Sequence, residues 1–187
     1  MRNQFKAFSL IEMLIVIALI GVLAAITIPN WFAYQKKIQA DLAGTTPKHA
    51  IETTQSLAIL RHQIVSLCPS DDQHHCQSAW RNFILIFTNP LQRDQPETPA
   101  AIIEVVPLIL HQSVIQWRHF SLNPSLNFSP SGQLLHDNGT FHYCQQDADV
   151  HFTRAFTLNI QGRFKELTER NSMGQLIDHN NQVISCP

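Results

Sequence analysis

One acidic residue of this chain stands where an ionised side chain is costly. Glu12 lies four residues into an apolar stretch that begins at Phe8, and no charged residue follows it between Met13 and Ile28. An ionised carboxylate inside a membrane-spanning helix costs on the order of 3 kcal/mol, so such residues are usually functional. The carboxylate of Glu12 is therefore the first candidate functional group, and it requires a positively charged partner.

A second group of charged residues lies near the C-terminal end. Between residues 154 and 170 four basic side chains stand against Glu166 and Glu169; the basic residues are Arg154, Arg163, Lys165 and Arg170. Arg163 and Lys165 alternate along the chain, so both point to the same side of an extended strand. Such a pair can contact the phosphates of a nucleic acid. The alternative is that both are ordinary solvated charges.

The four cysteines suggest disulfides more strongly than a metal site. They are Cys68, Cys76, Cys144 and Cys186. Three pairings are possible, and closure of the short loop favours a Cys68–Cys76 bridge, which leaves Cys144 for Cys186. Bridges of this kind imply an oxidising compartment. A zinc site would use Cys68, His74, His75 and Cys76, but the adjacent His-His-Cys lacks the spaced ligand pairs of structural zinc sites. We expect no metal.

Enzymatic activity is not expected. The chain has no phosphate-binding glycine loop, no Gly-x-Ser-x-Gly turn and no His-Glu-x-x-His helix, and its ten histidines show no shared ligand spacing. No cofactor is expected either. The formal net charge is −1 and charged residues make up 14% of the chain, which excludes a disordered polyelectrolyte and a generally basic nucleic-acid binder. Any contact with DNA must come from a local group of residues.

The apolar stretch predicts a helix that can cross a membrane. Residues 8–29 would span about 33 Å as a helix. Arg2 and Lys6 precede it, so the start should stay cytoplasmic and the remainder should be exported. The alternatives are a cleaved secretory signal, for which residues 25–27 imitate a cleavage site, and a plain signal anchor. The position of Glu12 argues against both.

The exported part is expected to begin as a helix and continue as a β domain. Helical spacing continues beyond Pro29, is interrupted at residues 43–47 and restarts at Pro47, ending at about Arg61. Whether the two pieces form a kinked rod or a true break is left open. Short apolar runs then alternate with turn residues, which is typical of antiparallel strands; the runs cover residues 64–67, 83–87, 102–110, 114–120, 126–128, 140–143 and 156–160. Pro107 indicates an edge strand, a bulge or two short strands.

These elements define an α+β fold, in which a long N-terminal helix packs on a small antiparallel β domain. The expected domains are a leader at residues 1–7, a membrane helix at 8–29 and an exported domain at 30–187. Within the exported domain the helix continues over residues 30–61, and the β domain covers 63–187.

The residues around Glu12 resemble a known processing motif. Lys-Ala-Phe-Ser-Leu-Ile-Glu-Met-Leu, from Lys6 to Leu14, is similar to the prepilin cleavage and methylation motif of type IV pilins and type II secretion pseudopilins. The resemblance implies that prepilin peptidase cuts between Ala7, where Gly is usual, and Phe8. The new amino group of Phe8 would then pair with Glu12 of a neighbouring subunit. Gly21 and Pro29 fall where such proteins place residues that weaken the helix.

Later segments resemble the GspH/FimT branch of minor pilins and pseudopilins, with FimT-like minor pilins favoured. The similar segments are Leu67–Ser70, Cys76 with Trp80 and Phe83–Phe87, Phe128–Gly132, Gly139–Cys144 and Ile160–Arg163. In DNA-binding members a Gly-Arg-x-Arg motif carries the phosphate contacts. It stands here as Gly162-Arg163-Phe164-Lys165, so the resemblance implies DNA contacts by Arg163 and Lys165, with Arg154 and Arg170 nearby. Gly162 would permit a turn that lifts the pair off the domain, and Phe164 either stacks on a base or points into the core.

The resemblance also implies a function. A minor pilin of this branch is anchored in the bacterial inner membrane, with its C-terminal domain in the periplasm, and then enters a pilus at the cell surface. Its partners would be other pilins, prepilin peptidase, the inner membrane and, for natural transformation, DNA. The alternatives are a GspH-like pseudopilin with a structural role in type II secretion, and a purely structural subunit that primes assembly.

Overall fold

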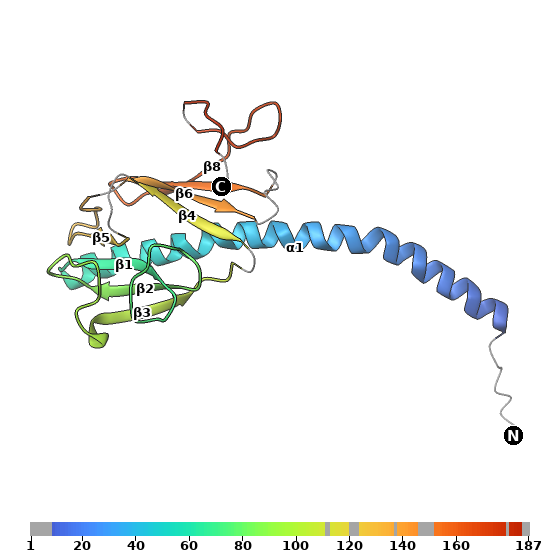
Figure 1. Ribbon diagram of the computed structural model, residues 1–187, viewed down its shortest axis with the longest axis horizontal. Coiled ribbons are helices and arrows are strands. Elements are labelled where there is room, and N and C mark those ends of the chain that lie inside the picture. The colour runs from blue at the N-terminus through green and yellow to red at the C-terminus, as the bar shows by residue number, and fades with distance from the viewer. Residues whose placement is uncertain are drawn as a thin grey trace, which may run out of the picture. The chain divides into compact units, whose positions relative to one another are not determined.

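The computed structural model describes residues 9–110, 113–119, 124–136, 138–145, 152–178 and 180–184, and of Pro29 only the backbone. The chain forms two compact units, Met1–Ile38 and Gln39–Pro187. Its elements are α1 (Leu10–Arg61), β1 (Val65–Ser70), β2 (Phe83–Thr88), the 3-10 helix η1 (Pro99–Ala101), β3 (Ile102–Pro107), β4 (Val114–His119), β5 (Leu126–Phe128), β6 (Gly139–Cys144), β7 (Arg154–Leu158) and β8 (Phe164–Leu167) (Figure 1).

The helix α1 is continuous over 52 residues. The interruption expected at residues 43–47 is absent, and the piece expected to restart at Pro47 is the continuation of α1. Gly44 does not mark a break, because a Cβ at this position would lie 2.1 Å from Cζ of Phe156. The hydroxyl of Thr45 donates to the carbonyl of Leu42 at 3.1 Å. Packing of this segment on the β domain offsets the backbone bond that Pro47 lacks.

The strands form two antiparallel sheets, one ordered β3-β2-β1-β5 and the other β4-β6-β7-β8. Pro107 ends β3, which is an edge strand, and this is one of the arrangements expected for that proline. The largest differences from the expected boundaries are at three strands: β1 extends to Ser70, β3 ends at Pro107 instead of residue 110, and β7 covers Arg154–Leu158 instead of residues 156–160. The other boundaries differ by one residue or agree. The strand β8 was not among the expected runs, because its apolar residues are too few to form one.

Both sheets and the C-terminal half of α1 share one hydrophobic core. The helix contributes small buried residues, among them Ala40, Ala43 and Ala58, which allow a close approach of the strands. Trp80 is 1% exposed, forms a bridge with Ile115 of β4 and meets the ring of Phe141 edge-on at 4.9 Å. This side chain therefore joins the second sheet to the loop that follows β1.

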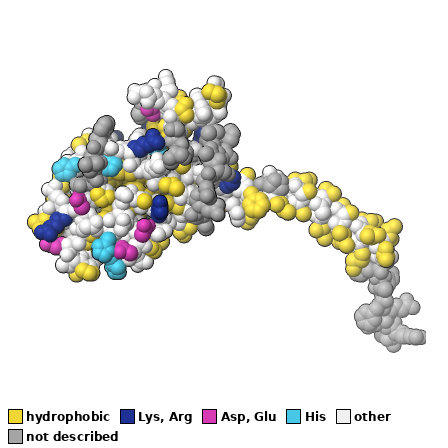
Figure 2. Space-filling view, in the orientation of Figure 1, with side chains coloured by type: hydrophobic (Ala, Val, Ile, Leu, Met, Phe, Trp, Pro, Cys, Tyr) yellow, Lys and Arg dark blue, Asp and Glu magenta, His cyan; other side chains and the backbone are white. Residues whose placement is uncertain are grey.

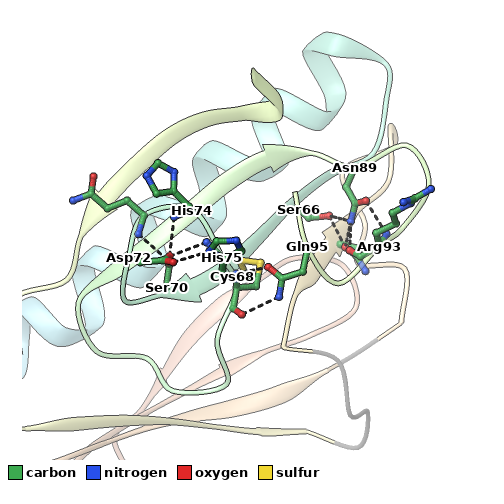
Figure 3. The surroundings of a disulfide bond; sticks show 12 residues. Ser66, Cys68, Ser70, Asp72, His74, His75, Asn89, Arg93 and Gln95 are labelled. Atoms are coloured by element: carbon green, nitrogen blue, oxygen red, sulfur yellow. Dashed lines mark hydrogen bonds and ion pairs between the residues drawn. A yellow bond between two sulfur atoms is a disulfide. The ribbon is translucent and has the colours of Figure 1, made fainter. Parts of the chain in front are cut away.

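A disulfide between Cys68 and Cys76 closes the loop after β1, as loop closure predicts (Figure 3). The Gln95 side chain binds both backbone groups of Cys76. Its Oε1 accepts from the Cys76 amide at 2.6 Å, and its Nε2 donates to the Cys76 carbonyl at 2.9 Å. Inside the loop, Asp72 accepts from the amides of His74 and His75. Both thiols are consumed, so the zinc site considered above lacks its thiolate ligands. Cys144 is also disulfide-bonded, and Cys186 lies outside the described residues.

Candidate functional site

Glu12 lies in the first turn of α1, on a part of the helix that is exposed along almost its whole length. Hydrophobic side chains cover this part (Figure 2), and those from Leu10 to Ile20 that are large are between 44% and 79% exposed. The hydroxyl of Ser9 accepts from the Glu12 amide at 3.3 Å, which makes Ser9 the N-cap of the helix and Glu12 its third residue. The carboxylate is therefore held at the positive end of the helix dipole.

The remaining residues of the processing motif are only partly described. Ala7 and Phe8 lie outside the described residues, so the pairing of Glu12 with the Phe8 amine stays a prediction. The helix runs unbroken through Gly21 and Pro29. Nothing lies within 4 Å of a Cβ built on Gly21, so packing within the described chain does not require glycine there. Pro29 has no amide proton, which leaves the Ala25 carbonyl without its usual helical donor.

Two of the four basic residues grouped by the sequence have structural roles. Arg154 is only 16% exposed at its side chain, and it lies 3.4 Å from both Asp41 of α1 and Glu166 of β8. These residues line a cleft of about 290 Å³ between the helix and the β7–β8 hairpin. Arg154 thus ties the helix to the sheet. Its expected role as a DNA contact is not supported by this placement.

Arg170 anchors the C-terminal segment. Its guanidinium donates to the carbonyl of Gly174 at 2.7 Å and to that of Thr153 at 3.1 Å. Burial, followed by the nearby charge of Arg154, lowers the pKa of this guanidinium. Arg170 therefore holds the turn that follows β8 against the start of β7.

Arg163 and Lys165 are both exposed, and neither makes an ion pair among the described residues. Gly162 adopts φ +76° in the turn before β8, as a glycine-dependent turn requires. This turn is not lifted off the domain, because Gly162 is buried and its Cβ would lie 2.7 Å from Nε2 of Gln55. Phe164 stacks on Phe156 at 5.2 Å and packs on the core, so it is not available to stack on a base.

The sheet register adds a residue that sequence reasoning missed. Arg118 on β4 pairs with Thr140, which pairs with Thr157, which pairs with Lys165. These four residues, here called the basic row, face away from the core, because their neighbours Trp117, Phe141, Phe156 and Phe164 face it. Three strand spacings separate Arg118 from Lys165, or about 14 Å. Glu166 lies on the opposite face, so the row itself carries positive charges and hydroxyls only.

His142 lies beside the basic row on the same face of β6, between Gln116 and Ala155. It is 5% exposed, and its Nδ1 has no hydrogen-bond partner among the described residues. Burial, and secondarily the charge of Arg118, lower the pKa of His142 from 6.5 to about 4. The imidazole is therefore neutral in the folded protein at neutral pH.

This placement predicts acid sensitivity. Because the pKa of His142 is lower in the folded chain than in the unfolded one, its contribution to stability is complete above pH 6.5 and is lost as the pH falls to about 4. We expect the free energy of unfolding to fall by about 1–3 kcal/mol over that range from this residue alone. Urea unfolding of residues 30–187 at several pH values measures the loss.

His142→Gln is the matched variant, because it removes the titrating group and keeps a polar side chain. Its stability should change less over the same pH range. The carboxyl of Asp72, whose pKa the hydrogen bond from His75 lowers, titrates below this window and does not confuse the comparison. An equal pH dependence in the variant and the parent chain would show that His142 is not the cause.

Comparison with known proteins decides the family. The family model described as type II transport protein GspH matches residues 48–162. This chain belongs to the GspH family. The model of the prokaryotic N-terminal methylation motif matches residues 2–28, which include Glu12. Together these matches confirm the resemblance to the family of minor pilins and pseudopilins. Arg163 and Lys165 lie just beyond the matched part.

Individual relatives agree with this assignment. Two fimbrial proteins of Pseudomonas aeruginosa are each 39% identical over 71 residues, which cover 37% of this chain and 46% of theirs, so the match spans about half the length of these relatives. Two crystal forms of the Pseudomonas aeruginosa type IV minor pilin FimU give TM-scores of 0.53 and 0.50, at 15% and 17% identity. They cover 71% and 66% of this chain and 91% and 89% of FimU, and they show a pilin-like fold. The minor pseudopilin EpsH of the Vibrio cholerae type 2 secretion system gives a TM-score of 0.47 at 14% identity. The match covers 69% of this chain and 96% of EpsH.

Proposed function

We propose that this GspH-family chain is a minor pilin, made as a prepilin, anchored in the bacterial inner membrane and then incorporated into a type IV pilus. The observation that carries the proposal is the exposed apolar helix from Leu10 to Ile28, in which Glu12 is the one charged residue. Water does not favour such a surface, so it requires lipid before assembly and other apolar helices afterwards. The helix is long and apolar enough to cross a membrane.

Processing follows from the same segment. Prepilin peptidase removes residues 1–7 by cutting between Ala7 and Phe8, and the released amine of Phe8 meets Glu12 of an adjoining subunit. The exported domain, residues 30–187, then lies on the outside of the filament. The disulfide between Cys68 and Cys76 agrees with export to an oxidising compartment. The fimbrial relatives favour a pilus over a secretion pseudopilus.

Recovery from sheared pili tests this proposal. The chain, carrying a C-terminal tag, should be present in the sheared pilus fraction, and N-terminal sequencing should begin at Phe8. Deletion of the prepilin peptidase should leave residues 1–7 attached and the chain in the membrane fraction. A start other than Phe8 would remove the prepilin assignment. Absence from pili, together with loss of protein secretion on deletion of this chain, would instead identify a type II secretion pseudopilin.

DNA is a second candidate partner, favoured by one specific observation. Lys165 of β8 and Arg163, two residues before it, are both exposed, and the basic row adds Arg118 across the sheet. Three positive charges spread over the sheet suit the phosphates of one strand. With so few contacts, binding should be sequence-independent, about micromolar and steeply dependent on salt. Several copies on one fibre would strengthen it through avidity.

A salt-titrated gel shift with residues 30–187 tests this second candidate. Replacing both Arg163 and Lys165 with alanine should weaken binding at low salt and reduce the slope of log affinity against log salt by about 1.5. The matched control is Lys48→Gln with Arg93→Gln, which removes two charges from other surfaces and should keep nearly all of the parental affinity for DNA. Equal binding by the alanine variant and the parent would refute the DNA contact.

A further inference from the structure

We propose that Trp31, Phe32 and Tyr34 form an interfacial anchor, which holds the subunit at the lipid headgroups of the periplasmic leaflet of the inner membrane before assembly. This inference rests on the membrane insertion proposed above. The three rings follow the apolar stretch within one turn of α1 and are 59%, 58% and 58% exposed. Among described residues they include every aromatic ring of the first unit, and none of them is buried.

The register of the helix places these rings at the membrane surface. If the hydrocarbon layer ends near Ile28, Trp31 lies about 4.5 Å and Tyr34 about 9 Å farther along the helix axis. The polar layer outside the hydrocarbon is about 5–7 Å thick on each side, and Trp and Tyr concentrate there because an apolar body carries a polar tip. Along the helix axis Trp31 lies within this layer and Tyr34 lies just beyond it, but the Tyr34 side chain is tilted back toward the helix N-terminus and so toward the layer. The rings of Trp31 and Tyr34 lie 6.4 Å apart on one side of the helix.

The polar residues around the rings fit the same boundary. On the membrane side, the Thr27 hydroxyl donates to the Leu23 carbonyl at 2.9 Å, and the Asn30 amide donates to the Ile26 carbonyl at 3.1 Å. Each of these hydrogen bonds lowers the cost of placing a polar side chain next to the hydrocarbon. On the outer side, Lys37 is exposed, and it follows Tyr34 by one turn. Its ammonium can reach back to a lipid phosphate.

Tryptophan quenching in vesicles tests the anchor with the full chain. The vesicles contain phosphatidylcholine and phosphatidylglycerol, with bromine near either the glycerol end or the methyl end of the acyl chains. The Trp31→Phe variant gives the background fluorescence of the other two tryptophans, which are Trp80, a buried residue, and Trp117, a residue of the other unit. We expect the Trp31 component to be quenched at least about twofold more by the shallow bromine.

A second variant measures depth within the same helix. In Trp31→Phe with Tyr34→Trp, the indole moves about 4.5 Å outward, so shallow quenching should be weaker than in the parent but still above background. A chain that floats with the vesicles but shows no quenching of Trp31 would overturn the anchor and leave membrane insertion standing. Stronger quenching by the deep bromine would also overturn it. A chain that does not float would refute the membrane helix together with the anchor.

Discussion

Replacing Glu12 with alanine should lower the amount of this subunit in sheared pili at least about tenfold, while its amount in the membrane stays near the parental level. A tenfold change corresponds to about 1.4 kcal/mol. Truncating one partner of a buried charge pair costs roughly 2–5 kcal/mol, because the other charge is left unpaired. Here the unpaired charge would be the amine of the neighbouring Phe8, among apolar helices, so a tenfold loss is a lower bound. Quantitative immunoblots of pilus and membrane fractions measure the ratio.

Ser9→Ala separates recruitment from helix capping. In the structure the Ser9 hydroxyl accepts from the Glu12 amide, so Glu12 also belongs to the first turn of α1. The Ser9 variant loses this cap, which costs about 1 kcal/mol of local helix stability, but keeps the carboxylate. It should enter pili at close to the parental level. If Ser9→Ala lowers the amount of subunit in pili as much as Glu12→Ala does, Glu12 acts by stabilising the end of the helix. If Glu12→Ala enters pili at the parental level, charge pairing does not recruit the subunit.

The sequence predicted the elements better than their junctions. The uncharged run after Glu12 and the end of the helix at Arg61 follow from hydropathy and spacing, and the helix ends there in the structure. Gly44 and Pro47 are locally helix-breaking, yet the helix continues through them. The reason is tertiary: Phe156, more than a hundred residues later, fills the space above Gly44, and no local pattern contains that contact.

The candidate binding residues show the same limit. Arg154, Arg163, Lys165 and Arg170 are neighbours in sequence, and charge counting treats them alike. The fold divides them, because Arg154 turns inward to Asp41 and Arg170 to the carbonyl of Thr153. Arg118 is far away in sequence and joins Lys165 only through three consecutive strand registers. Alternation predicted which way a side chain faces, but only pairing determines which residues share a surface.

Gly44→Val should lower the free energy of unfolding of residues 30–187 by about 3 kcal/mol. A Cβ at Gly44 would lie 2.1 Å from Cζ and 2.5 Å from Cε1 of Phe156. The ring has little room to move, since it is 7% exposed and stacks on Phe164 at 5.2 Å. Helix propensity alone predicts the opposite sign, because valine is the better helix former by a few tenths of a kcal/mol. Urea unfolding of the two proteins therefore distinguishes close packing from propensity.

Removing the ring should rescue much of this loss. Phe156→Ala is itself destabilising, by about 3–5 kcal/mol, because it leaves a cavity in the core. If the clash with the ring is the cause, the double variant Gly44→Val with Phe156→Ala should be more stable than the sum of the two single losses by at least about 1 kcal/mol. Additive losses would mean that another contact opposes valine. A single Gly44→Val variant as stable as the parent would mean that the helix does not need glycine to meet the sheet.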